Sequence, residues 1–293
     1  MMVPETIKTG IEDRLTQEKG LPVKIKSTAS IGGGCINNAS EIVTTSGRYF
    51  LKYNLALKYP DMFEKESLEL KLLASAGNIR LPEVVFHSTA GEYAFLLLEM
   101  IESGAGQPGF WTDFGSSLAA LHGHSAEMFG LDHDNYMGSL RQSNRFHPGW
   151  CDFFVAERLE PQLKMARDTG HISISAIKSF DNLYRKLPEL IPVEKPALIH
   201  GDLWNGNFMV SEEGKACLID PAAYYGHRES DIAMTKLFGG FSEDFYSAYN
   251  SAWPLEKGWQ QRIDILNLYP LLIHVNLFGI SYLRDVQNIV RQF

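Results

Sequence analysis

The chain has 293 residues, and its hydrophobic (45%) and charged (21%) fractions are typical of a globular protein and exclude a disordered one. Its 27 Lys and Arg against 35 Asp and Glu give a net charge of −8, which argues against general binding to nucleic acid or to an anionic membrane, since both need a positive surface. A phosphate-bearing ligand would therefore need a local solution, such as a glycine loop, a lysine or a metal ion.

Strand-like runs dominate the first third of the chain. In chain order we expect a hairpin of 41–45 and 49–52, an amphipathic helix at 63–73 that ends at Gly77, and strands at 84–86 and 93–100 around a turn at Gly91.

The pattern becomes helical after a linker at 101–109 that is rich in Gly, Ser and Pro. Helices are expected at 111–122, 150–169, 172–187, 243–252 and 261–293, with one strand-like island at 197–219. These elements predict an α+β fold with a small antiparallel-sheet domain at 1–101 and a larger, mainly helical domain at 102–293.

The cysteines and the apolar runs bear on where the protein works. Cys35, Cys151 and Cys217 are few and far apart, which does not indicate a disulfide framework and favours a reducing cytoplasm. The N-terminus is polar, without the apolar core of a signal peptide. The longest apolar stretch, 269–283, is interrupted by polar residues, so we expect a buried helix and no membrane span.

The densest motif is HGDLWNGN at 200–207, which is followed by Leu218-Ile219-Asp220-Pro221. An Asp-x-x-x-x-Asn spacing before a strand-borne Asp suits phosphoryl transfer from ATP. Asp202 would accept the proton of an attacking hydroxyl, while Asn207 and Asp220 would offer Mg²⁺ the oxygen ligands that it prefers. Taken singly, the same residues could shape a loop or cap a strand.

Phosphoryl transfer predicts further parts upstream, and candidates for each are present. A glycine-rich turn over the phosphates would come from Gly32, Gly33, Gly34 and Cys35. A strand lysine paired with a helix glutamate would be Lys52 with Glu66. An adenine-binding hinge would be formed by the backbone of Glu99, Met100 and Ile101. Glu66 is preferred to Glu64 and Glu69, although a charged solvent face would look the same. A Gly triplet alone is often a plain loop.

At these residues the chain resembles the kinase-like superfamily of aminoglycoside phosphotransferases and choline kinases, and more narrowly the fructosamine 3-kinase (ketosamine 3-kinase) family. The matching text is GGGCINNA at 32–39, HGDLWNGN at 200–207, LIDPAAYYGHRESDIAMTKLFGGF at 218–241, and the segments 129–140 and 269–279.

The resemblance implies a two-lobed protein-kinase-like fold that uses ATP and Mg²⁺ to phosphorylate the 3-hydroxyl of a small-molecule or protein-bound ketosamine, such as a fructosamine or ribulosamine adduct. Loss of the 3-phosphate would then free the amine, which would be a deglycation repair. Trp204 and His200 would contact the substrate, with Trp204 stacked on the sugar face or, alternatively, packed as a buried tryptophan. The resemblance leaves open whether the protein is a monomer or a dimer.

Departures from protein kinases are informative. Gly201 replaces the arginine that reads a phosphorylated activation loop, so regulation of that kind is not expected. Asp231 is expected to support the catalytic loop and His122 to be a core histidine. His227, Arg228 and Glu229 are expected either to form a buried ion network or to line the substrate pocket. Cys35 could be a site of inhibitory oxidation. The alternatives are another small-molecule kinase acting on an aminoglycoside, choline or sugar, and a catalytically dead nucleotide-binding protein.

Overall fold

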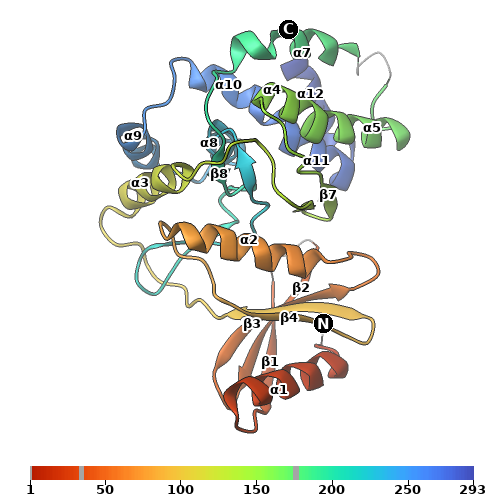
Figure 1. Cartoon of the computed structure of the whole chain (residues 1–293), viewed down its shortest axis with the longest axis vertical. Helices are drawn as coiled ribbons and strands as arrows, with labels where there is room; N and C mark the ends of the chain where they lie inside the picture. Colours follow the sequence, from red (N-terminus) through yellow and green to blue (C-terminus); the bar gives the residue numbers. More distant parts are fainter. Residues whose placement is uncertain (1, 33–35, 174–177) are drawn as a thin grey trace.

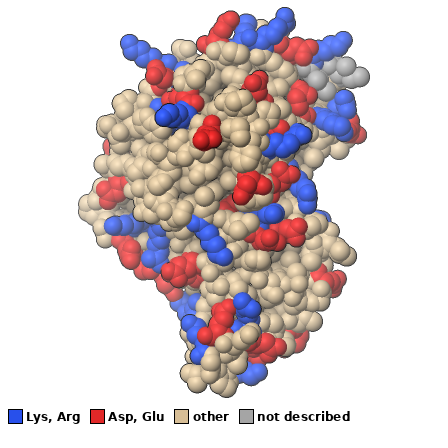
Figure 2. Space-filling view, in the orientation of Figure 1, with Lys and Arg blue, Asp and Glu red and all other residues tan. Residues whose placement is uncertain are grey.

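The computed structural model describes residues 2–32, 36–173 and 178–293. A sheet part forms the lower half of Figure 1 and a mainly helical part the upper half, and the space-filling view narrows between them (Figure 2). Charged side chains of both signs are interspersed over the face seen in Figure 2. The predicted α+β class is confirmed.

The sheet has five antiparallel strands in the order β1-β2-β3-β5-β4. Both predicted hairpins are present, because β2 pairs with β3 and β4 with β5. The bounds are Ile25–Ile31 for β1, Asn38–Thr44 for β2, Arg48–Leu55 for β3, Val84–Ala90 for β4 and Tyr93–Glu99 for β5. Strand β1 was not predicted, because its side chains are exposed or half-buried and no apolar alternation marks it.

One helix covers each face of the sheet (Figure 1). Helix α1 (Glu5–Lys19) was not predicted, although Ile7, Ile11 and Leu15 recur at helical spacing and pack into a core with the sheet. Helix α2 (Met62–Ala76) is the predicted helix and ends, as expected, at Gly77. It lies between the sheet and the helical part, so its side chains can reach both.

The coil after β5 crosses to the helical part and follows the predicted linker, since α3 begins at Phe110. The helices there are α3 (Phe110–His122), α4 (Trp150–Phe153), the π-helical turn η1 (Phe154–Leu159), α5 (Glu160–Asp168), α7 (Phe180–Leu190), α8 (Glu229–Leu237), α9 (Glu243–Ala252), α10 (Trp259–Leu266), α11 (Leu268–Phe278), the 3-10 turn η2 (Ile280–Tyr282) and α12 (Leu283–Val290). In the described part of the chain, three two-stranded antiparallel sheets lie among these helices: β6 (Asn135–Met137) with β7 (Leu140–Gln142), β8 (Ala197–Ile199) with β11 (Tyr224–Gly226), and β9 (Phe208–Val210) with β10 (Ala216–Leu218). The β9–β10 hairpin is inserted between β8 and β11.

Two helix predictions need correction. The stretch 261–293 is not one helix, because the chain turns near Asn267 and again at Gly279. Gly279 has a φ of 92°, a conformation that residues with a β-carbon rarely adopt. The stretch 150–169 is helical but contains the π turn. Of the predicted helix at 172–187, residues 174–177 lie outside the described residues, residues 172 and 173 are not helical, and α7 begins at Phe180 and continues to Leu190. Among the described helices, none is long and apolar enough to cross a membrane.

Candidate active site

The loop between β8 and β9 carries the HGDLWNGN motif, and Asp231 at the start of α8 fixes its first turn. Asp231 is buried and accepts hydrogen bonds from the backbone N–H groups of His200 (2.7 Å) and Gly201 (2.9 Å). A third hydrogen bond joins His122 Nε2 to Asp231 (3.1 Å), and Nδ1 of the same histidine is hydrogen-bonded to the Tyr249 hydroxyl (2.8 Å). Burial alone would raise the pKa of Asp231, but these bonds outweigh it and lower the pKa. The predicted roles of Asp231 and His122 are confirmed.

Glycine is required at position 201 by geometry. Its φ of +82° is left-handed, and an added Cβ would lie 2.1 Å from the backbone oxygen of Ala222. The loop and the segment after Asp220 are thus in backbone contact, and Ala222 N–H donates to the carbonyl of His200 over 2.9 Å. A side chain as large as arginine has no room at this position.

Asp202 and Asn207 form the centre of the loop. Asn207 Nδ2 donates to both the backbone oxygen (2.8 Å) and Oδ2 (2.9 Å) of Asp202. Asp202 Oδ1 accepts no hydrogen bond from the described residues. Burial raises the pKa of Asp202 to about 7, against the lowering effect of the Asn207 bond and with a further rise from the charge of Asp220. A carboxylate with a pKa near 7 is suited to taking a proton.

Lys52 joins the two parts of the molecule. From the centre of β3 its Nζ reaches Glu66 Oε1 on α2 (2.7 Å) and Asp220 Oδ1 (2.9 Å). Burial alone would lower the pKa of Lys52, but the charges of Asp220 and Glu66 outweigh it and raise the pKa, so the ammonium stays charged. The structure selects Glu66 as the partner, in agreement with the preference expressed from sequence.

Asp220 stands in the left-handed region with a φ of 52°, which is strained for a residue with a Cβ. Its side chain is 48% exposed, whereas the side chain of Lys52 is 7% exposed. The carboxylate therefore has one oxygen on the buried ammonium and the other turned to an accessible position. This geometry fits a group that meets a ligand.

The oxygen atoms available at this site fit a hard cation. Among the described residues, no group donates to Asp220 Oδ2 or to Asn207 Oδ1. Because the amide nitrogen of Asn207 is fixed on Asp202, its oxygen is the atom left to coordinate. One carboxylate oxygen and one amide oxygen are ligands that Mg²⁺ accepts.

His200 and Trp204 were predicted to contact substrate, and the structure gives them different surroundings. His200 is fully buried, with Nε2 donating to the Ile219 carbonyl (3.0 Å) and Nδ1 accepting from Asp202 N–H (3.3 Å). Burial lowers the pKa of His200, and its ring serves the loop, so the expected substrate contact is not available to it. Trp204 is half-buried and meets Phe238 edge-on at 5.7 Å. It therefore keeps an exposed surface while packing against the core.

The remaining nucleotide residues are less fully defined. Gly32 is exposed at the end of β1, whereas Gly33, Gly34 and Cys35 lie outside the described residues, so the phosphate loop and the idea of Cys35 oxidation stay predictions. Glu99, Met100 and Ile101 join β5 to the linker. The side chain of Glu99 turns away to Arg80 (2.6 Å), an ion pair that sequence reasoning missed, which leaves only backbone for the hinge.

His227, Arg228 and Glu229 are buried in a network of ion pairs and hydrogen bonds, which is the structural one of the two alternatives expected for them. Arg228 pairs with Glu194 (2.8 Å) and Glu229 with Arg262 (2.6 Å), while His227 Nε2 lies 3.2 Å from the Pro192 carbonyl. The partners Glu194 and Arg262 lie far away in sequence, and no local pattern identifies them.

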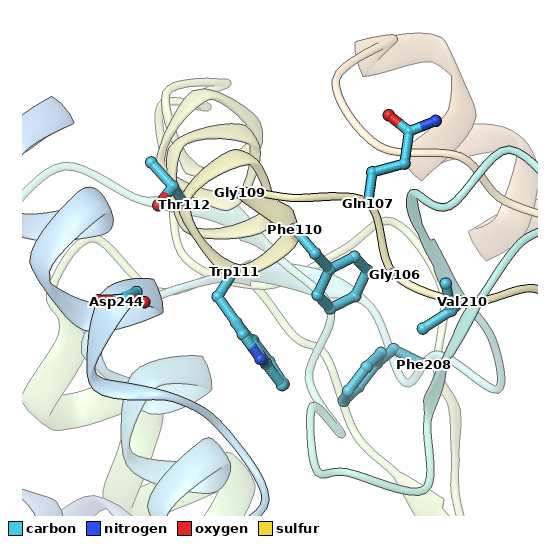
Figure 3. A pocket seen from close by; sticks show the side chains of 9 residues that line it. All are labelled: Gly106, Gln107, Gly109, Phe110, Trp111, Thr112, Phe208, Val210 and Asp244. Atoms are coloured by element: carbon cyan, nitrogen blue, oxygen red, sulfur yellow. The ribbon is translucent and has the colours of Figure 1, made fainter.

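A pocket of about 470 Å³ opens at the start of α3 (Figure 3). The rings of Phe110, Trp111 and Phe208 face it, and Phe208 directly follows Asn207. None of the predicted site residues lines it, and we assign it no role.

Comparison with known proteins identifies the family. The model of the fructosamine kinase family matches residues 7–293. The chain belongs to the fructosamine kinase family. A Synechocystis protein described as a ketoamine kinase is 39% identical over 287 residues, which cover 96% of this chain and 95% of the relative. The chloroplastic protein-ribulosamine 3-kinase of Arabidopsis thaliana is 36% identical over 283 residues (94% and 85%). The crystal structure of a Haemophilus somnus protein described as a fructosamine-3-kinase superposes with a TM-score of 0.87 at 30% identity and covers 96% of each chain. The predicted family and kinase-like fold are confirmed.

Proposed function

We propose that this protein is an ATP-dependent kinase that phosphorylates the 3-hydroxyl of ketosamines. The observation that carries the proposal is the meeting of Lys52, Glu66 and Asp220 beside the Asp202–Asn207 pair, in a chain that belongs to the fructosamine kinase family. A buried lysine held by two carboxylates beside a carboxylate with a free oxygen suits phosphoryl transfer.

Asp202 acts as the base. Its Oδ2 is held by Asn207, which fixes the carboxylate plane and leaves Oδ1 to accept the proton of the sugar hydroxyl. The proton passes to Asp202 as the hydroxyl oxygen bonds to the γ-phosphorus and the bond to the bridging oxygen of ADP breaks. Lys52 neutralises phosphate charge on the nucleotide side, so that positioning and electrostatics supply most of the rate.

Asn207 and Asp220 would hold Mg²⁺. Bound there, the ion would add to the positive charge of Lys52 in offsetting the phosphates, which matters in a protein with a net charge of −8. The backbone N–H groups of the predicted turn at 32–35 would bind the phosphates. The backbone of Glu99, Met100 and Ile101 would bind the adenine.

Trp204 would stack on the apolar C–H face of the sugar. Its half-buried position beside Phe238, within the loop that carries Asp202 and Asn207, supports this role. Elimination of the 3-phosphate from the product would then free the amine, and deglycation repair is the proposed outcome. The cytoplasm, expected from the few separated cysteines, remains the proposed location.

A substrate panel tests this proposal. ATP consumption is measured with ribulosamine, fructosamine, a ketosamine-modified protein, choline and an aminoglycoside, for the wild type and Asp202→Asn. We expect turnover of ketosamines only, abolished in the variant. Turnover of choline or the aminoglycoside instead would favour another small-molecule kinase, and ATP binding without any turnover would indicate a dead nucleotide-binding protein.

A further inference from the structure

A buried chain of polar side chains links α2 to the segment that follows Asp220. It begins at Glu69, one helical turn after Glu66 on the same face of α2, and Glu69 is only 2% exposed. Glu69 accepts a hydrogen bond from Asn135 Nδ2, which belongs to the helical part of the molecule. The same helix thus points one carboxyl group at Lys52 and a second one across to β6.

Asn135 is tied on all sides. Its Nδ2 also donates to the backbone oxygen of Ala223 (3.0 Å), and its Oδ1 accepts from Gln142 Nε2 and Asn144 Nδ2 (both 2.8 Å). All of these side chains are about 1% exposed. With donors and acceptor each engaged, the amide orientation is fixed by its partners.

Gln142 and Arg158 extend this series of hydrogen-bonded side chains. Gln142 also donates to the backbone oxygen of Ala222 (3.2 Å) and accepts from the Tyr269 hydroxyl (2.8 Å). Arg158, from the π turn, donates to Asn144 Oδ1 (2.7 Å) and faces the rings of Tyr224 (3.9 Å) and Phe153 (4.5 Å). In the described part of the chain Arg158 has no carboxylate partner. Each amide from Arg158 to Glu69 accepts on the arginine side and donates toward the carboxyl group, an alignment in which hydrogen bonds reinforce one another.

These contacts close a ring around the site. Lys52 binds Asp220, and the polypeptide backbone leads from Asp220 to Ala223, whose carbonyl accepts a hydrogen bond from Asn135. Asn135 also binds Glu69, and helix α2 connects Glu69 to Glu66, which binds Lys52. The bonds to the carbonyls of Ala222 and Ala223 also hold the backbone just after Asp220, which is in its strained left-handed conformation. A helix anchored only by Glu66 could rotate or shift on the sheet, whereas the second anchor fixes it to the metal-binding segment.

We propose that Glu69 and Asn135 are positioning residues that lock α2 to the Asp220 segment, so that Lys52 and Asp220 are held in register for ATP without activation-loop phosphorylation. The inference rests on the proposed function for the identity of the nucleotide. Neither residue touches the reacting atoms, and each acts through the Lys52–Glu66 pair and the backbone after Asp220.

The test separates positioning from stability. Asn135→Ala and Glu69→Ala should lower kcat/KM for ATP about 10- to 100-fold, because small misplacements of reacting groups cost that much, while KM for the ketosamine stays near the wild-type value. Glu69→Gln, which keeps an acceptor for Asn135, should restore most of the loss. Asn267→Ala is the matched control, since Asn267 is equally buried (3% exposed) and its Nδ2 donates to the Ala233 carbonyl over 2.8 Å, away from α2.

The outcomes discriminate clearly. A loss in the Asn135 and Glu69 variants that Asn267→Ala does not share, at equal concentrations of folded protein, supports the lock. Equal ATP parameters in all the variants overturn it, as does failure of Glu69→Gln to recover activity. If Asn135→Ala does not fold, the Glu69 pair carries the test alone. Calorimetric titration with a non-hydrolysable ATP analogue and Mg²⁺ repeats the comparison without substrate, so that a wrong ketosamine assignment, seen as wild-type inactivity, is distinguished from a wrong lock.

Discussion

Replacing Gly201 with alanine would test whether backbone contact between the catalytic loop and the Asp220 segment shapes the site. The left-handed φ of +82° costs a Cβ-bearing residue about 1–2 kcal/mol. The new Cβ would also lie 2.1 Å from the Ala222 oxygen and 2.8 Å from its carbonyl carbon, and such crowding costs typically about 1–3 kcal/mol more. Together the two effects predict a loss of about 2–5 kcal/mol in the free energy of unfolding.

Gly20→Ala is the matched control. Gly20 has a comparable φ of +68°, but a Cβ there would meet nothing within 4 Å, so only the conformational cost of about 1–2 kcal/mol applies. Thermal unfolding should show a Tm roughly 10 °C lower for Gly201→Ala and a fall of only a few degrees for Gly20→Ala.

The kinase assay provides the second readout. The clash pushes the loop away from Ala222, so Asp202 moves relative to Asp220, and kcat should fall about 100-fold in Gly201→Ala while Gly20→Ala stays at the wild-type rate. Equal Tm shifts in the two variants, together with unchanged turnover in Gly201→Ala, would show that contact between position 201 and Ala222 does not shape the site.

Further changes address the other parts of the site. Asp202→Asn should bind ATP yet lose nearly all turnover; normal phosphorylation by this variant would remove Asp202 as the base. The raised pKa of Asp202 also predicts a pH-dependent stability when no metal is bound. The folded wild type is stabilised by protonated Asp202 at low pH and loses this stability as the pH rises through about 7. In EDTA, the Tm of Asp202→Asn should therefore exceed that of the wild type by more at pH 8 than at pH 5. Lys52→Met should lower kcat/KM for ATP about 100-fold, whereas exposed Lys58→Met should not, as steady-state kinetics with varied ATP would show. Arg262→Leu would leave Glu229 buried and unpaired and should cost about 3–5 kcal/mol in denaturant unfolding while activity per folded molecule is kept; an unchanged midpoint would contradict the buried pair. EDTA should abolish turnover and added Mg²⁺ should restore it, and metal-independent turnover would exclude the assigned ligands.

Local chemistry explains which parts of the fold could be predicted from sequence. The β2–β3 hairpin follows from a turn tripeptide between a β-branched run at 41–45 and an aromatic and apolar run at 49–52, and α2 from apolar spacing that ends at a glycine. Helix α1 could also have been predicted, since Ile7, Ile11 and Leu15 recur at helical spacing, but the charged residues around them obscured this pattern. The break at Gly279 needed the actual backbone, because an apolar run alone does not show where a helix stops.

The site divides in the same way. The residue types and spacing in HGDLWNGN were enough to name Asp202 and Asn207, because phosphoryl transfer restricts both. His200 was misjudged, since a histidine that serves its own loop and one that faces a substrate look alike in sequence. Glu69 was considered only as a less favoured partner for Lys52, whereas it is buried against Asn135, a partner that only the fold brings near.

Identifying the atom that receives the phosphate tests the proposed 3-kinase activity. The wild-type enzyme is incubated with ATP, Mg²⁺ and ribulosamine, and the product is examined by two-dimensional phosphorus–proton NMR before elimination, with Asp202→Asn in parallel. We expect a single phosphate on the oxygen of carbon 3 and no product from the variant. A phosphate on another carbon, no transfer to the ketosamine, or product from Asp202→Asn would contradict it.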